Sequence, residues 1–257
     1  MPDKILLGDC LELMPSIPDK SIDMILCDLP YGTTACKWDV IIPFEPLWKE
    51  YNRIIKDNGA IVLTVSQPFT SQIIHSNIKN FKYEWIWVKN AGSNFATTKY
   101  QPMKEHESVL IFGNNTGLIK YNPIKQIRAP SGSARQKTPL TFNRKQKHEG
   151  GDVYNDIGIN NISKKMISVD RCPSSVQYFS RERGLHPTQK PVALFEYFIK
   201  TYTNEGETVL DNCAGSFTTA IACINTKRNY ICMEKEEKYF DIGEKRIKNH
   251  KAQLKLF

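Results

Sequence analysis

An acid and an aromatic ring follow a strand-like apolar run in the stretch ILCDLPYGT (25–33). The proline and the glycine of this stretch are sufficient for a turn, so Asp28 and Tyr31 need another explanation. The run at 21–28 is predicted to be a strand, and Asp28 stands at its carboxyl end. Ligands bind outside the carboxyl ends of the strands in open parallel sheets. We therefore expect Asp28 and Tyr31 to face a ligand.

A second candidate site lies in the stretch ETVLDNCAGSFTT (207–219), in the last third of the chain. Asp211 ends a predicted strand, and small residues lead from it into a predicted helix. Small residues allow a ligand to approach the backbone, and amides at a helix N-terminus favour a negatively charged group. Glu234 follows Asp211 by 23 residues, at the end of the next predicted strand. Since dinucleotide-binding folds place an acid on the ribose at a spacing of about 20 residues, this combination predicts a nucleoside cofactor.

The net charge of +8 is concentrated in one segment, 114–184, which contains thirteen Lys and Arg against five Asp and Glu. The rest of the chain holds equal numbers of basic and acidic residues. A basic segment of this kind is the usual electrostatic footprint of a nucleic-acid partner. A solvated loop region explains the charge equally well, so charge alone leaves both interpretations open.

Composition and cysteine usage indicate a globular protein of a reducing compartment. Hydrophobic residues make up 40% and charged residues 24% of the 257, which is ordinary for a soluble protein. The seven cysteines form no C-x-x-C pair, which argues against a disulfide framework and against a zinc site. The sequence has neither an apolar run of about eighteen residues nor a signal-peptide pattern. We expect a cytoplasmic protein without a metal centre or a membrane partner.

Strand-like and helix-like runs alternate on both sides of the basic segment, which predicts an α/β sheet. The predicted strands are 4–8, 21–28, 59–66, 83–90, 106–113, 207–213 and 229–235, and the predicted helices are 43–59, 66–78, 191–203, 217–226 and 236–253. The simplest organisation is one α/β domain of about seven strands, formed by 1–113 and 185–257, with 114–184 as a loop-rich insertion.

Four motifs of the sequence resemble those of one family. DLPY (28–31) resembles the D-P-P-Y motif of enzymes that methylate the exocyclic amines of DNA bases, and HPTQKP (186–191) is similar to the motif that precedes their cofactor strand. VLDNCAGSFTT (209–219) resembles their S-adenosylmethionine loop, and GDCLELM (8–14) resembles a further element of their cofactor pocket. The catalytic motif precedes the cofactor loop, with a variable segment between them, as in the β group of these enzymes. The resemblance implies a Rossmann-like methyltransferase sheet with circularly permuted motif order.

Two residues depart from the family pattern. Leu29 replaces the first proline of the tetrapeptide, which changes the rigidity of the turn more than its chemistry. Phe217 stands where the family usually has glycine, and its ring either narrows the cofactor pocket or packs into the core.

The resemblance also explains the surplus acid and ring of the first stretch. An aromatic amine is a poor nucleophile, because its lone pair is delocalised into the ring. Asp28 and the Pro30 carbonyl would accept its two N–H groups and draw the nitrogen toward tetrahedral geometry, and the charged acceptor is the stronger. The methyl group then moves directly from sulfonium to nitrogen, without a metal or a covalent intermediate. The target base must be flipped out of the duplex, and Tyr31 is expected to stack on it.

The resemblance implies two further groups of contacts. Asp9 and Glu234 are expected on the adenosine part of the cofactor, with Glu234 on the ribose, and His186 and Lys190 at its carboxylate end. The full set of expected cofactor contacts is Asp9, Cys10, His186, Thr188, Lys190, Asp211, Ala214, Gly215, Ser216, Thr218 and Glu234. In the insertion, basic residues are expected to neutralise phosphates and to read guanine edges; the set is Lys125, Arg128, Arg135, Lys137, Arg144 and Lys145.

The leading hypothesis is a site-specific DNA methyltransferase that uses S-adenosylmethionine and acts on adenine N6 in double-stranded DNA. The nearest rival hypothesis is a cytosine-N4 methyltransferase, although its motif more often begins with serine than with aspartate. A third hypothesis is a non-catalytic DNA-binding relative disabled at Phe217, and a fourth is an RNA or protein amine methyltransferase. The family also suggests a homodimer and a cognate restriction endonuclease as partners.

Overall fold

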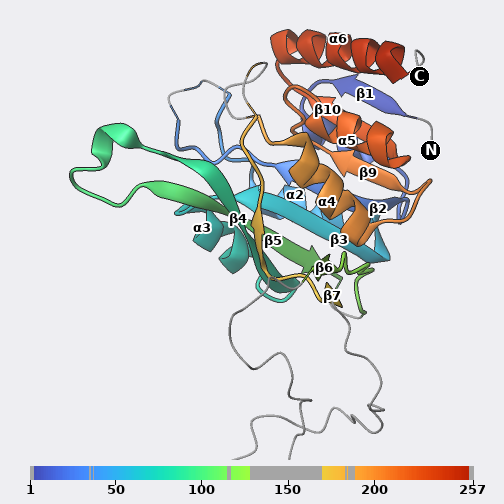
Figure 1. Cartoon of the computed structure of the whole chain (residues 1–257). Coiled ribbons are helices and arrows are strands. Elements are labelled where there is room, and N and C mark those ends of the chain that lie inside the picture. The colour runs from blue at the N-terminus through green and yellow to red at the C-terminus, as the bar shows by residue number, and fades with distance from the viewer. Residues whose placement is uncertain are drawn as a thin grey trace, which may run out of the picture. The chain divides into compact units, whose positions relative to one another are not determined.

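The computed structural model describes residues 3–34, 36, 38–114, 117–127, 170–182, 184 and 189–254. The chain divides into two compact units. The larger unit combines Met1–Pro123 with Ser174–Phe257, and the smaller one is Ile124–Pro173. The larger unit contains the sheet and the helices described next (Figure 1).

The larger unit is built on one mixed sheet, in which seven strands cover the seven predicted runs. The order across the sheet is β1 (Lys4–Leu7), β10 (Asn229–Glu234), β9 (Thr208–Asp211), β2 (Ile22–Asp28), β3 (Ile55–Val65), β5 (Lys104–Gly113), β4 (Phe81–Ser93) and β8 (Val176–Tyr178). Neighbouring strands from β1 to β3 are parallel, whereas β5 runs antiparallel to β3 and β4. The predicted α/β class and the antiparallel pair are therefore confirmed.

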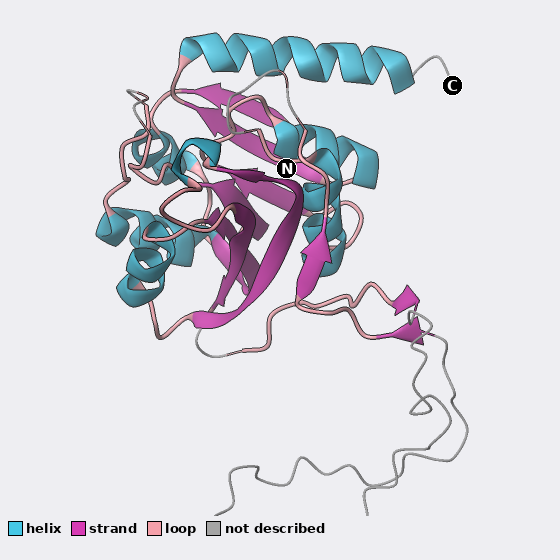
Figure 2. Ribbon diagram, turned by 60° about the vertical axis from the view of Figure 1, so that its left-hand side comes forward, coloured by secondary structure: helices cyan, strands magenta, loops and turns pink. Residues whose placement is uncertain are grey.

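Helices cover both faces of this sheet (Figure 2). On one face lie α4 (Val192–Tyr202), α5 (Thr218–Thr226) and α6 (Glu237–Leu254); on the other lie α1 (Cys10–Leu13), α2 (Phe44–Ile54) and α3 (Phe69–Ser76). Short 3₁₀ turns occur at Met14–Ser16 and Phe95–Thr97. Strand side chains alternate between the faces, so Met24 and Leu26 join the first core and Ile25 and Cys27 the second. A continuous apolar run is what a parallel strand buried on both faces requires.

The predicted helix 43–59 is too long, because β3 already begins at Ile55. Ile55 is buried and pairs with Ile22 of β2. Gly59 is not the end of a helix. A Cβ atom at this position would lie 2.7 Å from the side chain of Ile55 and 2.8 Å from the carbonyl oxygen of Asp23, so the close approach of two strands explains the glycine.

Strand β8 was not predicted, and it lies within the interval 114–184 that the sequence assigns to the insertion. Its three residues pair with Ile86–Val88 of β4, so this part of the interval belongs to the larger unit. The same holds before the smaller unit, since the Asn122 backbone donates to the carbonyl of Thr201. The smaller unit contains β6 (Gln126–Ile127) paired antiparallel with β7 (Asp170–Arg171). None of the helices in the described ranges is long and apolar enough to cross a membrane.

Phe217 is fully buried and belongs to the core beneath α6. Its φ of +58° is left-handed, which explains why a glycine suits this position. The ring meets Phe240 edge-on at 5.6 Å between ring centroids. A Cβ atom on Gly243 would lie 2.5 Å from the Phe217 ring. The ring therefore packs into the core and does not narrow the cofactor pocket.

The contact between Phe217 and Gly243 predicts that a glycine-to-alanine substitution in a helix will destabilise the protein. Replacing glycine by alanine inside a helix normally stabilises a protein by about 0.5–1 kcal/mol. Gly243→Ala should instead lower the free energy of unfolding by about 1–3 kcal/mol, because the added methyl group overpacks the core against the ring. Denaturant unfolding measures this change, and the same substitution in a Phe217→Leu background should cost less. A stabilising Gly243→Ala would contradict the packing described.

Candidate active site

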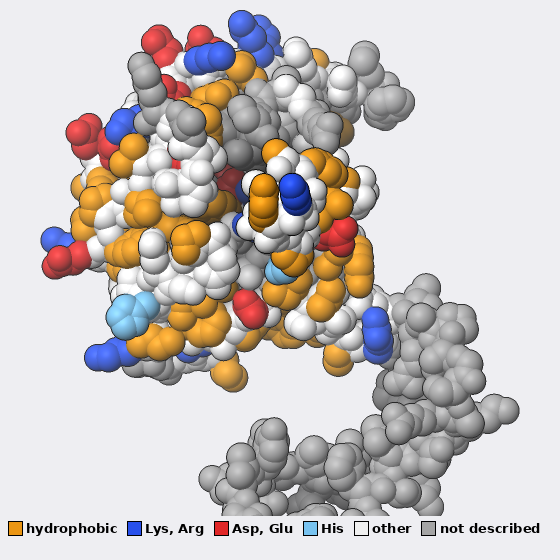
Figure 3. All heavy atoms as spheres, turned by 90° about the vertical axis from the view of Figure 1, so that its left-hand side faces the viewer, with side chains coloured by type: hydrophobic (Ala, Val, Ile, Leu, Met, Phe, Trp, Pro, Cys, Tyr) orange, Lys and Arg blue, Asp and Glu red, His pale blue; other side chains and the backbone are white. Residues whose placement is uncertain are grey.

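A cavity of about 710 Å³ lies at the carboxyl ends of β1, β2, β9 and β10. This volume is typical of a small-molecule site. In the space-filling view, the surface beside the end of the β4–β5 hairpin is hollowed, and charged atoms are visible inside (Figure 3). Every described residue of the predicted catalytic and cofactor sets lines the cavity: Asp9, Cys10, Asp28, Pro30, Tyr31, Lys190, Asp211, Ala214, Gly215, Ser216, Thr218 and Glu234.

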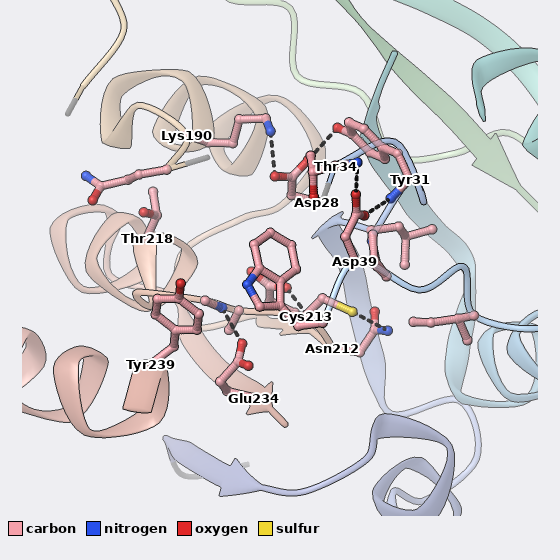
Figure 4. A pocket seen from close by; sticks show the side chains of 18 of the residues that line it. Asp28, Tyr31, Thr34, Asp39, Lys190, Asn212, Cys213, Thr218, Glu234 and Tyr239 are labelled. Carbon is pink, nitrogen blue, oxygen red and sulfur yellow. Dashed lines mark hydrogen bonds and ion pairs between the residues drawn. The ribbon is translucent and has the colours of Figure 1, made fainter. Parts of the chain in front are cut away.

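Asp28, the last residue of β2, has three partners that fix both of its carboxylate oxygens. Its Oδ1 accepts hydrogen bonds from Thr64 Oγ1 at 2.7 Å and from the Tyr31 hydroxyl at 2.5 Å. Its Oδ2 lies 2.5 Å from Nζ of Lys190. Figure 4 shows Lys190 and Tyr31 reaching the carboxylate from different elements. Both oxygens are therefore oriented before any ligand binds.

Lys190 belongs to a row of four buried or half-buried charges of alternating sign. Its Nζ lies between Asp28 and Glu107, 3.6 Å from Oε2 of the latter, and Oε1 of Glu107 lies 2.5 Å from Nζ of Lys89. Burial lowers the pKa of Lys190, but Asp28 and Glu107 outweigh it and leave the pKa above its ordinary value. Burial likewise raises the pKa of Glu107, and Lys190 and Lys89 bring it below its ordinary value. Lys190 and Glu107 therefore stay charged at neutral pH.

Tyr31 has partners on its hydroxyl and on its ring. The hydroxyl also lies 2.9 Å from the carbonyl oxygen of Thr64. The ring stacks on Phe69 at 5.3 Å between centroids, with 27° between the planes. Burial and the charge of Asp28 hold the pKa of Tyr31 well above its ordinary value, so it remains a donor to Asp28. Stacking of Tyr31 on a base stays a prediction.

A carboxylate that the sequence did not single out, Asp39, holds the turn after Asp28. It is 8% exposed and lines the cavity. It accepts four backbone N–H groups, from Tyr31 at 2.7 Å and Gly32 at 2.9 Å on Oδ1, and from Thr33 at 2.9 Å and Thr34 at 2.7 Å on Oδ2. Figure 4 shows Asp39 beside Thr34 and Tyr31. The turn is therefore fixed by one side chain outside it.

In the predicted cofactor half of the cavity, the acids also hold the loop backbone. Glu234 accepts the N–H of Gly215 at 2.7 Å, and Gly215 has a left-handed φ of +52° that suits glycine. Asp211 accepts the N–H of Cys213 at 3.1 Å and the Thr219 hydroxyl. Asp9 caps α1 through the N–H of Leu11. Strand-end carboxylates and a tight, small-residue loop thus form one wall of the cavity.

Most of the remaining predicted site residues lie outside the described part of the chain. His186 and Thr188 lie outside the described residues, as do Arg128, Arg135, Lys137, Arg144 and Lys145. Lys125 is described and exposed. The described residues include no cluster of three or more His, Cys, Asp or Glu that could hold a metal ion.

Several residues that contact the cavity or its lining were not predicted from the sequence. Lys89 and Glu107 are charged residues inside strand-like runs, and such an interruption is the signal that could have drawn attention to them. Arg246 of α6 donates to the Ser216 carbonyl and to Thr218 Oγ1, both at 3.0 Å. Thr64 and Arg246 carry no signal of their own, because their role appears only when distant segments meet.

Asp211 gives a prediction for stability against pH. Burial, opposed by the hydrogen bonds from Thr219 and Cys213, raises the pKa of Asp211 from 3.8 to about 7. The folded state therefore holds its proton more tightly than the unfolded state. This contribution to stability is complete below about pH 4 and is lost as the pH rises through about 7. Asn at this position can accept the N–H of Cys213 with its oxygen and donate its NH₂ group to the Thr219 hydroxyl, without titrating.

Between pH 4 and pH 8, Asp211 should therefore lower the free energy of unfolding of the parent protein by on the order of 4 kcal/mol. Asp211→Asn should not show this fall. Denaturant unfolding of both proteins across this pH range measures the difference. Parallel curves for the two proteins would contradict the assignment.

A family model of DNA methylases, N6_N4_Mtase, matches residues 22–245, so the chain belongs to this family. The DNA adenine methyltransferase YhdJ of Escherichia coli is 28% identical over 257 residues, which cover 95% of this chain and 82% of YhdJ. Among solved structures, M1.HpyAVI in complex with SAM is 24% identical and aligns with a TM-score of 0.60 over 95% of this chain and 98% of its own. The cytosine-N4-specific PvuII DNA methyltransferase aligns with a TM-score of 0.62 at 16% identity, over 97% and 91% of the two chains.

Proposed function

We propose that this protein transfers the methyl group of S-adenosylmethionine to the N6 amine of an adenine flipped out of double-stranded DNA. The observation that carries the proposal is the position of Asp28. It ends a parallel strand at the cavity, with one oxygen held by Thr64 and Tyr31 and the other by Lys190. An acceptor that is held in place by such contacts, beside a fixed turn, is what activation of an aromatic amine needs.

In this mechanism, Asp28 and the Pro30 carbonyl accept the two N–H groups of the target amine. Both residues line the cavity and are separated by one residue of the turn. The lone pair of the nitrogen is then directed toward the electrophile. When bound, S-adenosylmethionine supplies that electrophile as a methyl group on sulfonium. Lys190 stays protonated because its pKa is raised, so it orients Asp28 and does not act as the base. Asp28 is placed to accept the extra proton of the methylated nitrogen.

The chemistry of the cavity wall fits S-adenosylmethionine. The acidic side chains of Asp9, Asp211 and Glu234 suit ribose hydroxyls, and the small residues at 214–216 allow close approach. Two buried oxygens that line the cavity, Ser66 Oγ and Glu107 Oε2, have no hydrogen-bond partner among the described residues. A bound ligand can therefore donate hydrogen bonds to these two oxygens, although Glu107 Oε2 already has Nζ of Lys190 at 3.6 Å.

Two observations favour adenine over cytosine as the target. The catalytic motif begins with aspartate, and the relative YhdJ is named an adenine methyltransferase. The fold makes no choice between the two bases, because the PvuII enzyme has the same fold and is named cytosine-N4-specific. The aspartate and the named relative therefore leave the cytosine-N4 alternative not favoured.

The basic interval 114–184 is the proposed reader of the DNA sequence. Its thirteen Lys and Arg, among them the exposed Lys125, would neutralise phosphates. Affinity for duplex DNA should then fall steeply as salt is added. Self-association into a homodimer and a paired restriction endonuclease are further proposals that come from the family.

A transfer assay with labelled methyl groups tests the proposal. The protein is incubated with S-adenosylmethionine and with duplex DNA, RNA or a protein mixture, and the label in each polymer is counted. Label in duplex DNA is the expected result. Label in RNA or protein would assign another substrate class. DNA binding and no label anywhere would favour a non-catalytic DNA-binding protein.

A further inference from the structure

The contact between Asp39 and Tyr31 reaches the catalytic centre through the backbone. The N–H of Tyr31, which donates to Asp39 at 2.7 Å, belongs to the same planar peptide unit as the carbonyl of Pro30. In a trans unit the N–H and the C=O point in opposite directions. With the N–H directed at Asp39, the direction of the Pro30 carbonyl oxygen is therefore also fixed.

The same contact changes the electron density of that carbonyl. A hydrogen bond to an ionised carboxylate is about twice as strong as a neutral one. Hydrogen-bonded peptide groups polarise one another, so a strongly bound N–H makes its own carbonyl a better acceptor. Burial raises the pKa of Asp39, but the hydrogen bonds from Thr34, Gly32 and Thr33 bring it below its ordinary value, so the side chain stays ionised.

The surroundings of Asp39 show that its negative charge is directed at the turn. No described lysine or arginine forms an ion pair with it, and four consecutive backbone N–H groups donate hydrogen bonds to it. A carboxylate that only stabilised a loop could lie anywhere in the protein, far from the catalytic residues. This one lines the same cavity as Asp28 and Pro30.

We propose that Asp39 is a positioning residue for methyl transfer, which orients and polarises the Pro30 carbonyl through the peptide unit that Pro30 shares with Tyr31. This role rests on the methyltransferase function proposed above. Asp39 acts on the amine only through Pro30, the second acceptor. Its removal should therefore lower the rate of transfer and leave ligand binding in place.

The test compares two buried carboxylates, each replaced by asparagine. In Asp39→Asn, one oxygen becomes an NH₂ group, so two of the four backbone N–H groups lose their acceptor. The matched control is Asp23→Asn. Asp23 is 6% exposed on β2, accepts the N–H of Thr208 at 3.0 Å and pairs with Lys56 at 2.7 Å, and does not line the cavity. Both variants should unfold at a lower temperature than the parent protein.

For Asp39→Asn, kcat in the labelled-methyl assay should fall by about 10- to 100-fold. The Kd for S-adenosylmethionine from calorimetry and the KM for duplex DNA should stay within about threefold of the parent values. Asp23→Asn should keep the parent kcat.

Three outcomes would overturn this role: an unchanged kcat in Asp39→Asn, a loss of cofactor binding that matches the loss of kcat, or an equal loss of kcat in Asp23→Asn. The parent protein separates this inference from the proposed function. If it transfers no methyl group, the function itself fails, whereas an active parent with an equally active Asp39→Asn removes only the role of Asp39.

Discussion

Asp28→Asn should lower the single-turnover rate of methyl transfer by about a thousandfold. The substitution keeps the size of the side chain, but an NH₂ group takes the place of one oxygen. If that group faces the target amine, it repels an N–H where an acceptor is required. If it faces Lys190, it meets an ammonium group at the position of a 2.5 Å ion pair. Either orientation removes the charge that draws the amine toward tetrahedral geometry.

The cofactor site supplies the control for this variant. Asp28 is not a predicted cofactor contact, so the Kd for S-adenosylmethionine should stay near its parent value when measured by calorimetry. A transfer rate within about tenfold of the parent rate would show that Asp28 is not the main acceptor.

Lys190→Met should lower both the stability of the protein and its rate of methyl transfer. The substitution keeps most of the volume and removes the cation between Asp28 and Glu107. Breaking a buried ion pair in this way typically costs about 3–5 kcal/mol, because it leaves a buried charge without compensation. Denaturant unfolding measures this loss. The transfer rate should fall by about 100-fold, since Oδ2 of Asp28 is no longer oriented.

A double variant distinguishes charge balance from positioning. Lys190→Met with Glu107→Gln removes one charge of each sign and leaves Asp28 and Lys89 in the row. It should regain part of the lost stability and none of the lost transfer rate. If Lys190→Met alone cost less than about 1 kcal/mol, or if the double variant recovered its transfer rate, the role of this charge row would be wrong.

The sequence was sufficient to predict the residues at strand ends, for a physical reason. Asp28, Asp211 and Glu234 each follow a strand of a parallel sheet, and the carboxyl ends of parallel strands meet at one edge. Their convergence on one cavity therefore follows from strand assignment alone, and the motifs supplied their order. Gly215 follows one of these strands, and its left-handed φ suits a glycine.

The contacts that were missed arise from tertiary pairing. Lys89 and Glu107 meet because β4 and β5 form an antiparallel pair, and Glu107 reaches Lys190 only when that pair lies beside β3 and β2. β8 consists of three residues that pair with β4 from a distant part of the chain. Asp39 accepts hydrogen bonds from backbone N–H groups. Every residue except proline carries such a group, so the residue types of the turn do not indicate the contact. Gly59 was predicted to end a helix from its residue type alone, but it lies where two strands approach each other closely.

Mass spectrometry of the methylated nucleosides tests the central claim most directly. Unmethylated bacterial genomic DNA is incubated with the protein and S-adenosylmethionine, digested to nucleosides and analysed, with Asp28→Asn in parallel. We expect N6-methyladenine from the parent protein and none above background from the variant. N4-methylcytosine would keep the mechanism and change the target base. The absence of any methylated nucleoside, or an equal yield of N6-methyladenine from Asp28→Asn, would contradict the assignment of the cavity as a methyl-transfer site centred on Asp28.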